Sequence, residues 1–87
     1  MTDKPFQQST DAPAQPSGVY RQALIHLDTR AGTTAGRIAI DVGMGSSAQG
    51  LRAPLRDMER WGWVRRLDDQ APVAWLRTEA GTEALNA

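Results

Sequence analysis

Residues 31–66 read AGTTAGRIAIDVGMGSSAQGLRAPLRDMERWGWVRR, and the apolar spacing within this stretch decides the fold. Leu51, Leu55 and Met58 follow one another at the i, i+4 and i+7 positions of a single helical face. This spacing predicts a helix over residues 46–61. Capping residues stand at its two ends, Ser46 at the start and Gly62 after the end.

A shorter helix is predicted upstream, over residues 34–42, where Ile38 is followed by further apolar side chains. Either Thr33 or Thr34 offers an N-cap for it. The glycine-rich residues 43–45 then predict a tight turn into the longer helix.

The first helix is predicted to begin after Ser17, because Tyr20, Leu24 and Leu27 again recur at i, i+4 and i+7. Gly32 is the residue expected to end this helix.

After the longest helix the apolar period changes from helical to extended. Residues 63–67 (WVRRL) and 73–77 (VAWLR) flank the five turn-forming residues 68–72. The pattern predicts a β-hairpin.

A short last helix is predicted after Thr78, which offers an N-cap, with Glu79 in the first turn. Gly81 lowers the stability of a helix by about 1 kcal/mol relative to alanine, so we expect this helix to fray.

The order helix, helix, tight turn, helix, hairpin and short helix resembles that of the winged helix-turn-helix family across roughly residues 18–85. The Gly-Trp-Val sequence at 62–64 is similar to the family's Gly-aromatic-Val signature at the start of the wing. WLRTEAG at 75–81 is similar to the hydrophobic-Thr-x-x-Gly segment that follows the second wing strand. The resemblance implies an α+β fold: a three-helix core, a C-terminal β-hairpin wing and a short last helix. It also implies that residues 46–61 form the recognition helix.

The polar face of this helix suits DNA. With the apolar residues toward the core, the helical period turns Arg52 and Arg56 outward, where arginine can donate two hydrogen bonds to guanine in the major groove. Gln49 on the same face can pair with adenine. The predicted base contacts are Gln49, Arg52 and Arg56, and the predicted phosphate contacts are Ser46, Ser47, Arg60, Arg65 and Arg66.

The net charge of zero hides an uneven distribution. From residue 46 to 66 five arginines oppose two carboxylates, a net charge of +3, whereas from 67 to 87 one arginine opposes four carboxylates, a net charge of −3. The basic part favours a nucleic-acid partner. The alternative is a solvated helix whose arginines pair with Asp57 and Glu59.

Three features depart from the family pattern. The wing tip carries Asp68 and Asp69 before Gln70, so we expect it to be repelled by phosphate and not to insert into DNA. Pro54 removes one helical hydrogen bond and predicts a bend or a helix in two parts. Arg77 occupies a place where relatives usually carry an apolar residue.

The tryptophans have different expected roles. Trp63 is predicted to fill the core between helices and hairpin. Trp75 shares a strand face with Val73, and that face either packs on the third helix or stays exposed as a partner surface. Trp61 is either an exposed oligomer contact or partly buried against the first hairpin strand.

Composition excludes several functions. Without cysteine there is no disulfide framework or thiol nucleophile, and His26 has no second histidine with which to bind a metal. We expect no enzymatic activity, no cofactor and no small-molecule ligand. No apolar run is long enough to span a membrane, so a cytoplasmic protein is expected. Residues 1–17 are predicted to be a disordered tail, with a partner-binding peptide at Phe6 as the alternative, and residues 18–87 to be the domain.

Together these observations predict a transcriptional regulator that binds double-stranded DNA. A single domain makes few base contacts, so a homodimer is expected, with the first helix (Tyr20, Ile25, His26) and the last helix as alternative contact surfaces. The alternative function is a winged-helix protein-interaction module that binds through the acidic wing, Trp61 and Trp75.

Overall fold

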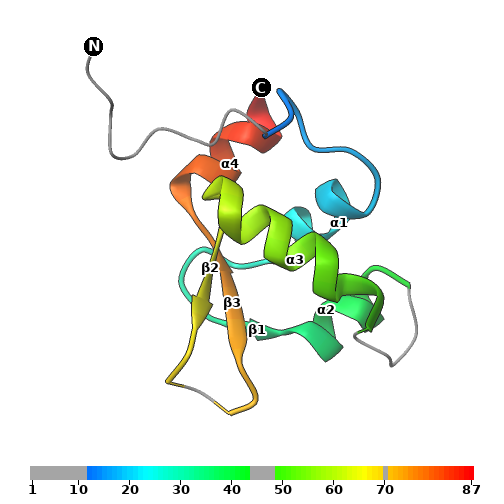
Figure 1. The fold of residues 1–87 in the computed structure, drawn as a ribbon, viewed down its shortest axis with the longest axis vertical. Helices are drawn as coiled ribbons and strands as arrows, with labels where there is room; N and C mark the ends of the chain where they lie inside the picture. The colour runs from blue at the N-terminus through cyan, green and yellow to red at the C-terminus, as the bar shows by residue number, and fades with distance from the viewer. Residues whose placement is uncertain (1–11, 44–48, 70) are drawn as a thin grey trace.

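The computed structural model describes residues 12–43, 49–69 and 71–87, which form four helices and a three-stranded antiparallel sheet (Figure 1). The order along the chain is α1 (Gly18–His26), β1 (Thr33–Thr34), α2 (Ala35–Asp41), α3 (Gln49–Trp61), β2 (Val64–Leu67), β3 (Ala74–Arg77) and α4 (Glu79–Asn86). The prediction of a small α+β fold is therefore confirmed. None of the helices within these ranges has the length and apolar character needed to cross a membrane.

The sheet contains one strand that the sequence did not predict. Its order is β1-β3-β2, and Thr33 of β1 pairs with Trp75. A strand of two residues has no measurable period, which is why the pattern could not reveal it. Thr34 also begins α2, since its Oγ1 accepts a hydrogen bond from the Arg37 amide at 3.2 Å. Of the two candidate caps, Thr34 is therefore the one used.

Helix α1 is shorter than predicted and ends at His26, well before Gly32. The Ser17 side chain makes no capping hydrogen bond. Asp28 explains the early end, because its side chain accepts a hydrogen bond from the Arg30 amide at 2.8 Å. Its carbonyl oxygen accepts another from the Arg77 amide at 2.9 Å, which ties this loop to β3.

Helix α3 is continuous through Pro54, so the expected helix in two parts is wrong for the described residues. Proline removes a single backbone hydrogen bond, and the buried side chains of Leu51, Leu55 and Met58 hold both halves of the helix on the core. The helix ends as predicted: Gly62 has φ +86°, and the Trp63 amide donates to the Met58 carbonyl at 2.8 Å.

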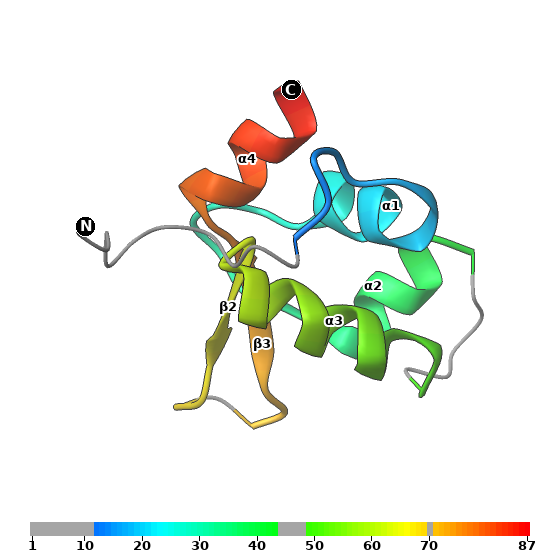
Figure 2. The ribbon, with the colours of Figure 1, turned by 45° about the horizontal axis from the view of Figure 1, so that its top comes forward.

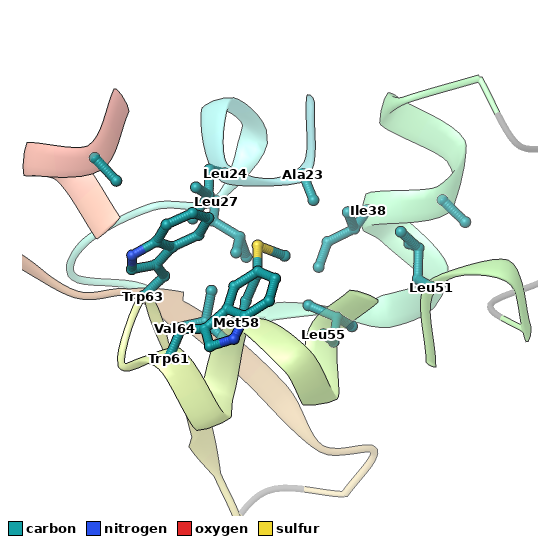
Figure 3. Close-up of a cluster of buried hydrophobic side chains, with 12 residues drawn as sticks. Ala23, Leu24, Leu27, Ile38, Leu51, Leu55, Met58, Trp61, Trp63 and Val64 are labelled. Atoms are coloured by element: carbon teal, nitrogen blue, oxygen red, sulfur yellow. The ribbon is translucent and has the colours of Figure 1, made fainter. Parts of the chain in front are cut away.

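The core lies between the three N-terminal helices and the start of the hairpin (Figure 3). Trp63 is fully buried there, as predicted. Trp61 is only 7% exposed, so the expected exposed oligomer contact is wrong. Its indole packs on the Tyr20 ring of α1 at 5.4 Å and on Trp63, the first residue of the predicted hairpin strand, at 5.0 Å between ring centroids.

Helix α4 is connected to the rest of the fold by Arg77, which stands at the position where members of the resembled family usually carry an apolar residue. Its Nη1 donates to the Leu24 carbonyl at 2.8 Å and its Nε donates to Thr82 Oγ1 at 2.9 Å. The guanidinium therefore satisfies a carbonyl at the end of α1 that a methyl group could not. Thr78 caps α4 as predicted, accepting from the Gly81 amide at 3.1 Å.

Residues 12–17 of the predicted tail contact the folded part. Pro16 is buried, and Gln15 Nε2 donates to the carbonyl oxygen of Ala87 at 3.1 Å. The expectations for residues 1–11, Phe6 included, lie outside the described residues.

Candidate nucleic-acid interface

The polar face of α3 is exposed along its described length. Arg52 and Arg56 stand one helical turn apart and point to solvent, beside the buried Leu51 and Leu55. The exposed residues of this face are Gln49, Arg52, Ala53, Arg56 and Arg60. Figures 1 and 2 show the hairpin projecting beyond α3 on the side away from α1 and α4. The predicted contacts Ser46 and Ser47, and Gln70 at the hairpin tip, lie outside the described residues.

Arg52 and Arg56 form no ion pair within residues 12–43, 49–69 and 71–87, because both carboxylates of the helix face other partners. Asp57 lies 3.5 Å from Arg60, and Glu59 lies 3.6 Å from Arg66. The alternative of a solvated helix with internal ion pairs therefore holds for Arg60 but not for Arg52 and Arg56.

Asp57 also joins α3 to α1. The Tyr20 hydroxyl donates to Asp57 Oδ2 at 3.0 Å. Burial raises the pKa of Tyr20, and the hydrogen bond to Asp57 and the carboxylate charge raise it further, while Arg60 acts in the opposite direction. This contact sets how α3 lies across α1, and with it the direction in which the exposed arginines point.

Arg66 is held between two carboxylates and an aromatic ring. Its Nε lies 3.6 Å from Glu59 and 3.0 Å from Asp68, and its guanidinium carbon lies 6.0 Å from the centroid of Trp75. Trp75 is the residue directly opposite Arg66 in the β2–β3 register. A side chain with these partners is less available to phosphate than the sequence suggested.

Arg65 is exposed but belongs to the other face of the sheet. Adjacent strand residues alternate between faces, and Arg65 pairs with Leu76 rather than with Trp75. The two arginines predicted to contact phosphate together, Arg65 and Arg66, are therefore separated by the sheet.

A surface groove of about 250 Å³ runs between α3 and the hairpin. Its lining combines apolar side chains with charged ones: Ala35, Arg52, Leu55, Arg56, Glu59, Arg66, Val73 and Trp75. Trp75 and Val73 both lie on the side of β3 that meets α3. Trp75 is partly buried against the core, as one alternative expected, whereas Val73 stays 37% exposed, as the other did. Glu59 and Ala35 were missed, since only the strand register and the position of α2 bring them here.

The hairpin tip is negatively charged. Asp68 and Asp69 are both exposed, and the Asp68 side chain is 73% accessible even while it pairs with Arg66. This placement keeps an acidic surface at the end of the hairpin, next to the basic face of α3.

No group of residues in the described ranges could hold a metal ion. His26 is exposed at the end of α1. The pKa of Asp28 is lowered, first by the hydrogen bond from the Arg30 amide and then by those from Thr29 and Ala31, a local effect of the loop.

Comparisons with protein-family models, with curated proteins and with solved structures found no match to this chain.

Proposed function

We propose that this chain is a winged helix-turn-helix protein that binds double-stranded DNA through α3, with the β2–β3 hairpin as its wing. The observation that carries the proposal is the pair Arg52 and Arg56, exposed and without a carboxylate partner among the described residues, on a helix whose other face is in the core. An α-helix fits the major groove, and an arginine without a competing carboxylate is free to donate to guanine.

The mode of binding follows from how each charge is held. Arg52 and Arg56 contact bases, with Gln49 on the same face. Arg60 contacts phosphate and gives up its weak ion pair with Asp57 when it does so. Arg66 contributes little because Glu59 and Asp68 already neutralise it. The wing tip stays away from the backbone, since its aspartates repel phosphate.

We further propose that the protein is a transcriptional regulator, not an enzyme, that acts by occupying an operator as a homodimer. One α3 reads only a few base pairs, and a two-fold pair on two half-sites doubles the contacts.

The test is a titration with duplex DNA of mixed sequence at low and at moderate salt. We expect binding that weakens steeply as salt rises, because phosphate contacts release counterions. The double variant Arg52→Ala with Arg56→Ala is expected to lower affinity at least tenfold, on the order of 1–3 kcal/mol per lost base contact.

A matched control variant has the same net charge as the double variant of Arg52 and Arg56. Arg21→Ala with Arg30→Ala removes two exposed arginines on and after α1, which belong neither to α3 nor to the hairpin. If both double variants weaken binding equally, net charge explains it and the assigned face is wrong. If the native chain binds no DNA at low salt, the proposed function is wrong.

A further inference from the structure

The groove beside α3 has an apolar floor that DNA binding does not require. Val73 is 37% exposed, Trp75 is half-buried, and both line the groove together with Leu55. Phosphates and base edges are bound by hydrogen-bond donors and cations. The apolar surface of Val73 and Trp75 gains no free energy of burial from such a polar partner. The floor suits a partner that buries an apolar side chain.

The rim of the groove is positively charged. Arg52 and Arg56 have no carboxylate partner in the described part of the chain, and Glu59, the one acidic lining residue, is paired with Arg66 at 3.6 Å. A partner that fills this groove must therefore bring negative charge close to its apolar group.

The size of the groove limits how much of a partner it can enclose. Pockets that enclose a whole small molecule usually measure roughly 300–1,000 Å³. This groove, at about 250 Å³, lies below that range and accommodates one bulky side chain. A polypeptide can anchor one side chain here and place neighbouring carboxylates on the arginines.

We propose that this groove binds an acidic segment of a partner protein, with one aliphatic side chain seated between α3 and β3 and flanking carboxylates on Arg52 and Arg56. The same two arginines carry the proposed DNA contact. Where that proposed function holds, the acidic segment and DNA exclude one another, and the partner acts as an antagonist of DNA binding.

The experiment uses the full chain and a synthetic peptide in which a single leucine is flanked by glutamates. Trp61 and Trp63 are buried, so Trp75 is the tryptophan that the peptide reaches, and its fluorescence reports binding. We expect a saturable change in emission at low salt. A second peptide with serine in place of the leucine is expected to bind about tenfold more weakly, because it buries no aliphatic group.

Two variants test the floor of the groove. Val73→Asp places a carboxylate beside the peptide's own acids and is expected to abolish the emission change. Ile40→Asp makes the same change at another exposed aliphatic residue, on α2, and is expected to bind the peptide as the native chain does. Both positions are exposed, and circular dichroism checks that both variants fold.

The outcomes separate the two proposals. Equal binding of the leucine and serine peptides, or equal loss in both variants, overturns the groove proposal whatever DNA does. Peptide binding without DNA binding supports the groove and contradicts the proposed function. Where both bind, displacement of labelled DNA by the leucine peptide but not by the serine peptide at the same concentration supports the antagonism, and simultaneous binding overturns it.

Discussion

Gly81 lies where α4 passes closest to the end of α3. A Cβ atom built at this position would overlap the Trp63 carbonyl oxygen and meet the Arg77 Cγ at 3.0 Å. The glycine that weakens α4 by its intrinsic propensity is therefore required by packing. The close approach also lets the Trp63 carbonyl accept a hydrogen bond from the Thr78 amide at 3.0 Å.

We expect Gly81→Ala to destabilise the protein by about 1–3 kcal/mol, because overlap with backbone atoms cannot be relieved by a rotamer change. Gly36→Ala is the matched control, since Gly36 is also helical and a Cβ atom built there meets nothing within 4 Å. The control is expected to raise stability by up to about 1 kcal/mol. Urea unfolding measures both, and equal effects would contradict the packing explanation.

Residues whose role depends on near neighbours in the chain could be predicted from the sequence. The caps at Thr78 and Gly62 and the core position of Trp63 are confirmed, because each follows from local spacing. Arg77 could not be interpreted in this way. Its partners are Leu24, far away in the chain, and Thr82, and only the folded chain places them together.

At the level of elements, the position of α3 depends on its contact with α1. The Tyr20 hydroxyl donates to Asp57, and the Tyr20 ring packs on Trp61, so one side chain holds both the polar and the apolar part of this contact. Because this contact orients α3, it also determines the direction in which the exposed arginines of α3 point.

Tyr20→Phe is expected to lower stability by about 1 kcal/mol near neutral pH, since it removes a hydrogen bond to a carboxylate and keeps the ring. Burial and Asp57 raise the pKa of Tyr20 above its usual 10.0 in the folded state. The stabilisation is therefore fully present below pH 10.0 and is lost as pH rises through the higher folded value. Unfolding followed at increasing pH should show this loss in the native chain and not in the variant. An identical alkaline loss in both would contradict the assignment.

In the hairpin, a shift of one residue in the pairing of β2 with β3 changes which side chains lie on the same face. A five-residue connection over residues 68–72 would set Leu67 opposite Val73. The structure pairs Leu67 with Ala74 instead, which sets Trp75 opposite Arg66. A shift by one residue exchanges the faces of a strand, so the composition of the groove could not be derived from the predicted strands alone.

In the proposed DNA complex the aspartates of the hairpin tip would repel phosphate, and a charge reversal there should change this. Asp69→Lys is expected to raise DNA affinity at low salt and to steepen the salt dependence by about one phosphate contact. Glu83→Lys, an equal charge change at an exposed position of α4, is the control and is expected to have little effect. Equal gains in both variants would mean that net charge, rather than the position of the wing, governs binding.

For the molecule as a whole, the basic and the acidic segments of the chain meet at the hairpin, where Arg66 pairs with Asp68 at 3.0 Å. The arginine face of α3 adjoins the acidic hairpin tip, and the neutral total describes neither surface.

The proposed homodimer predicts a sedimenting mass near twice the 9.5 kDa of one chain at high protein concentration. The reason lies in the proposed function: one α3 would offer few base contacts, and useful specificity would need two half-sites. Sedimentation equilibrium with and without a two-half-site duplex measures it. A single-chain mass under both conditions would contradict the dimer and leave the DNA contact of one α3 to stand alone.

The sequence by itself determined the elements: the four helices, the hairpin and most of their ends follow from apolar period and capping residues, which act over a few positions along the chain. The tertiary structure alone decided the rest. It showed β1, the early end of α1, the burial of Trp61, the separation of Arg65 from Arg66 and the groove beside α3. These features depend on which distant segments meet and in which register, and a pattern along one segment does not contain that information.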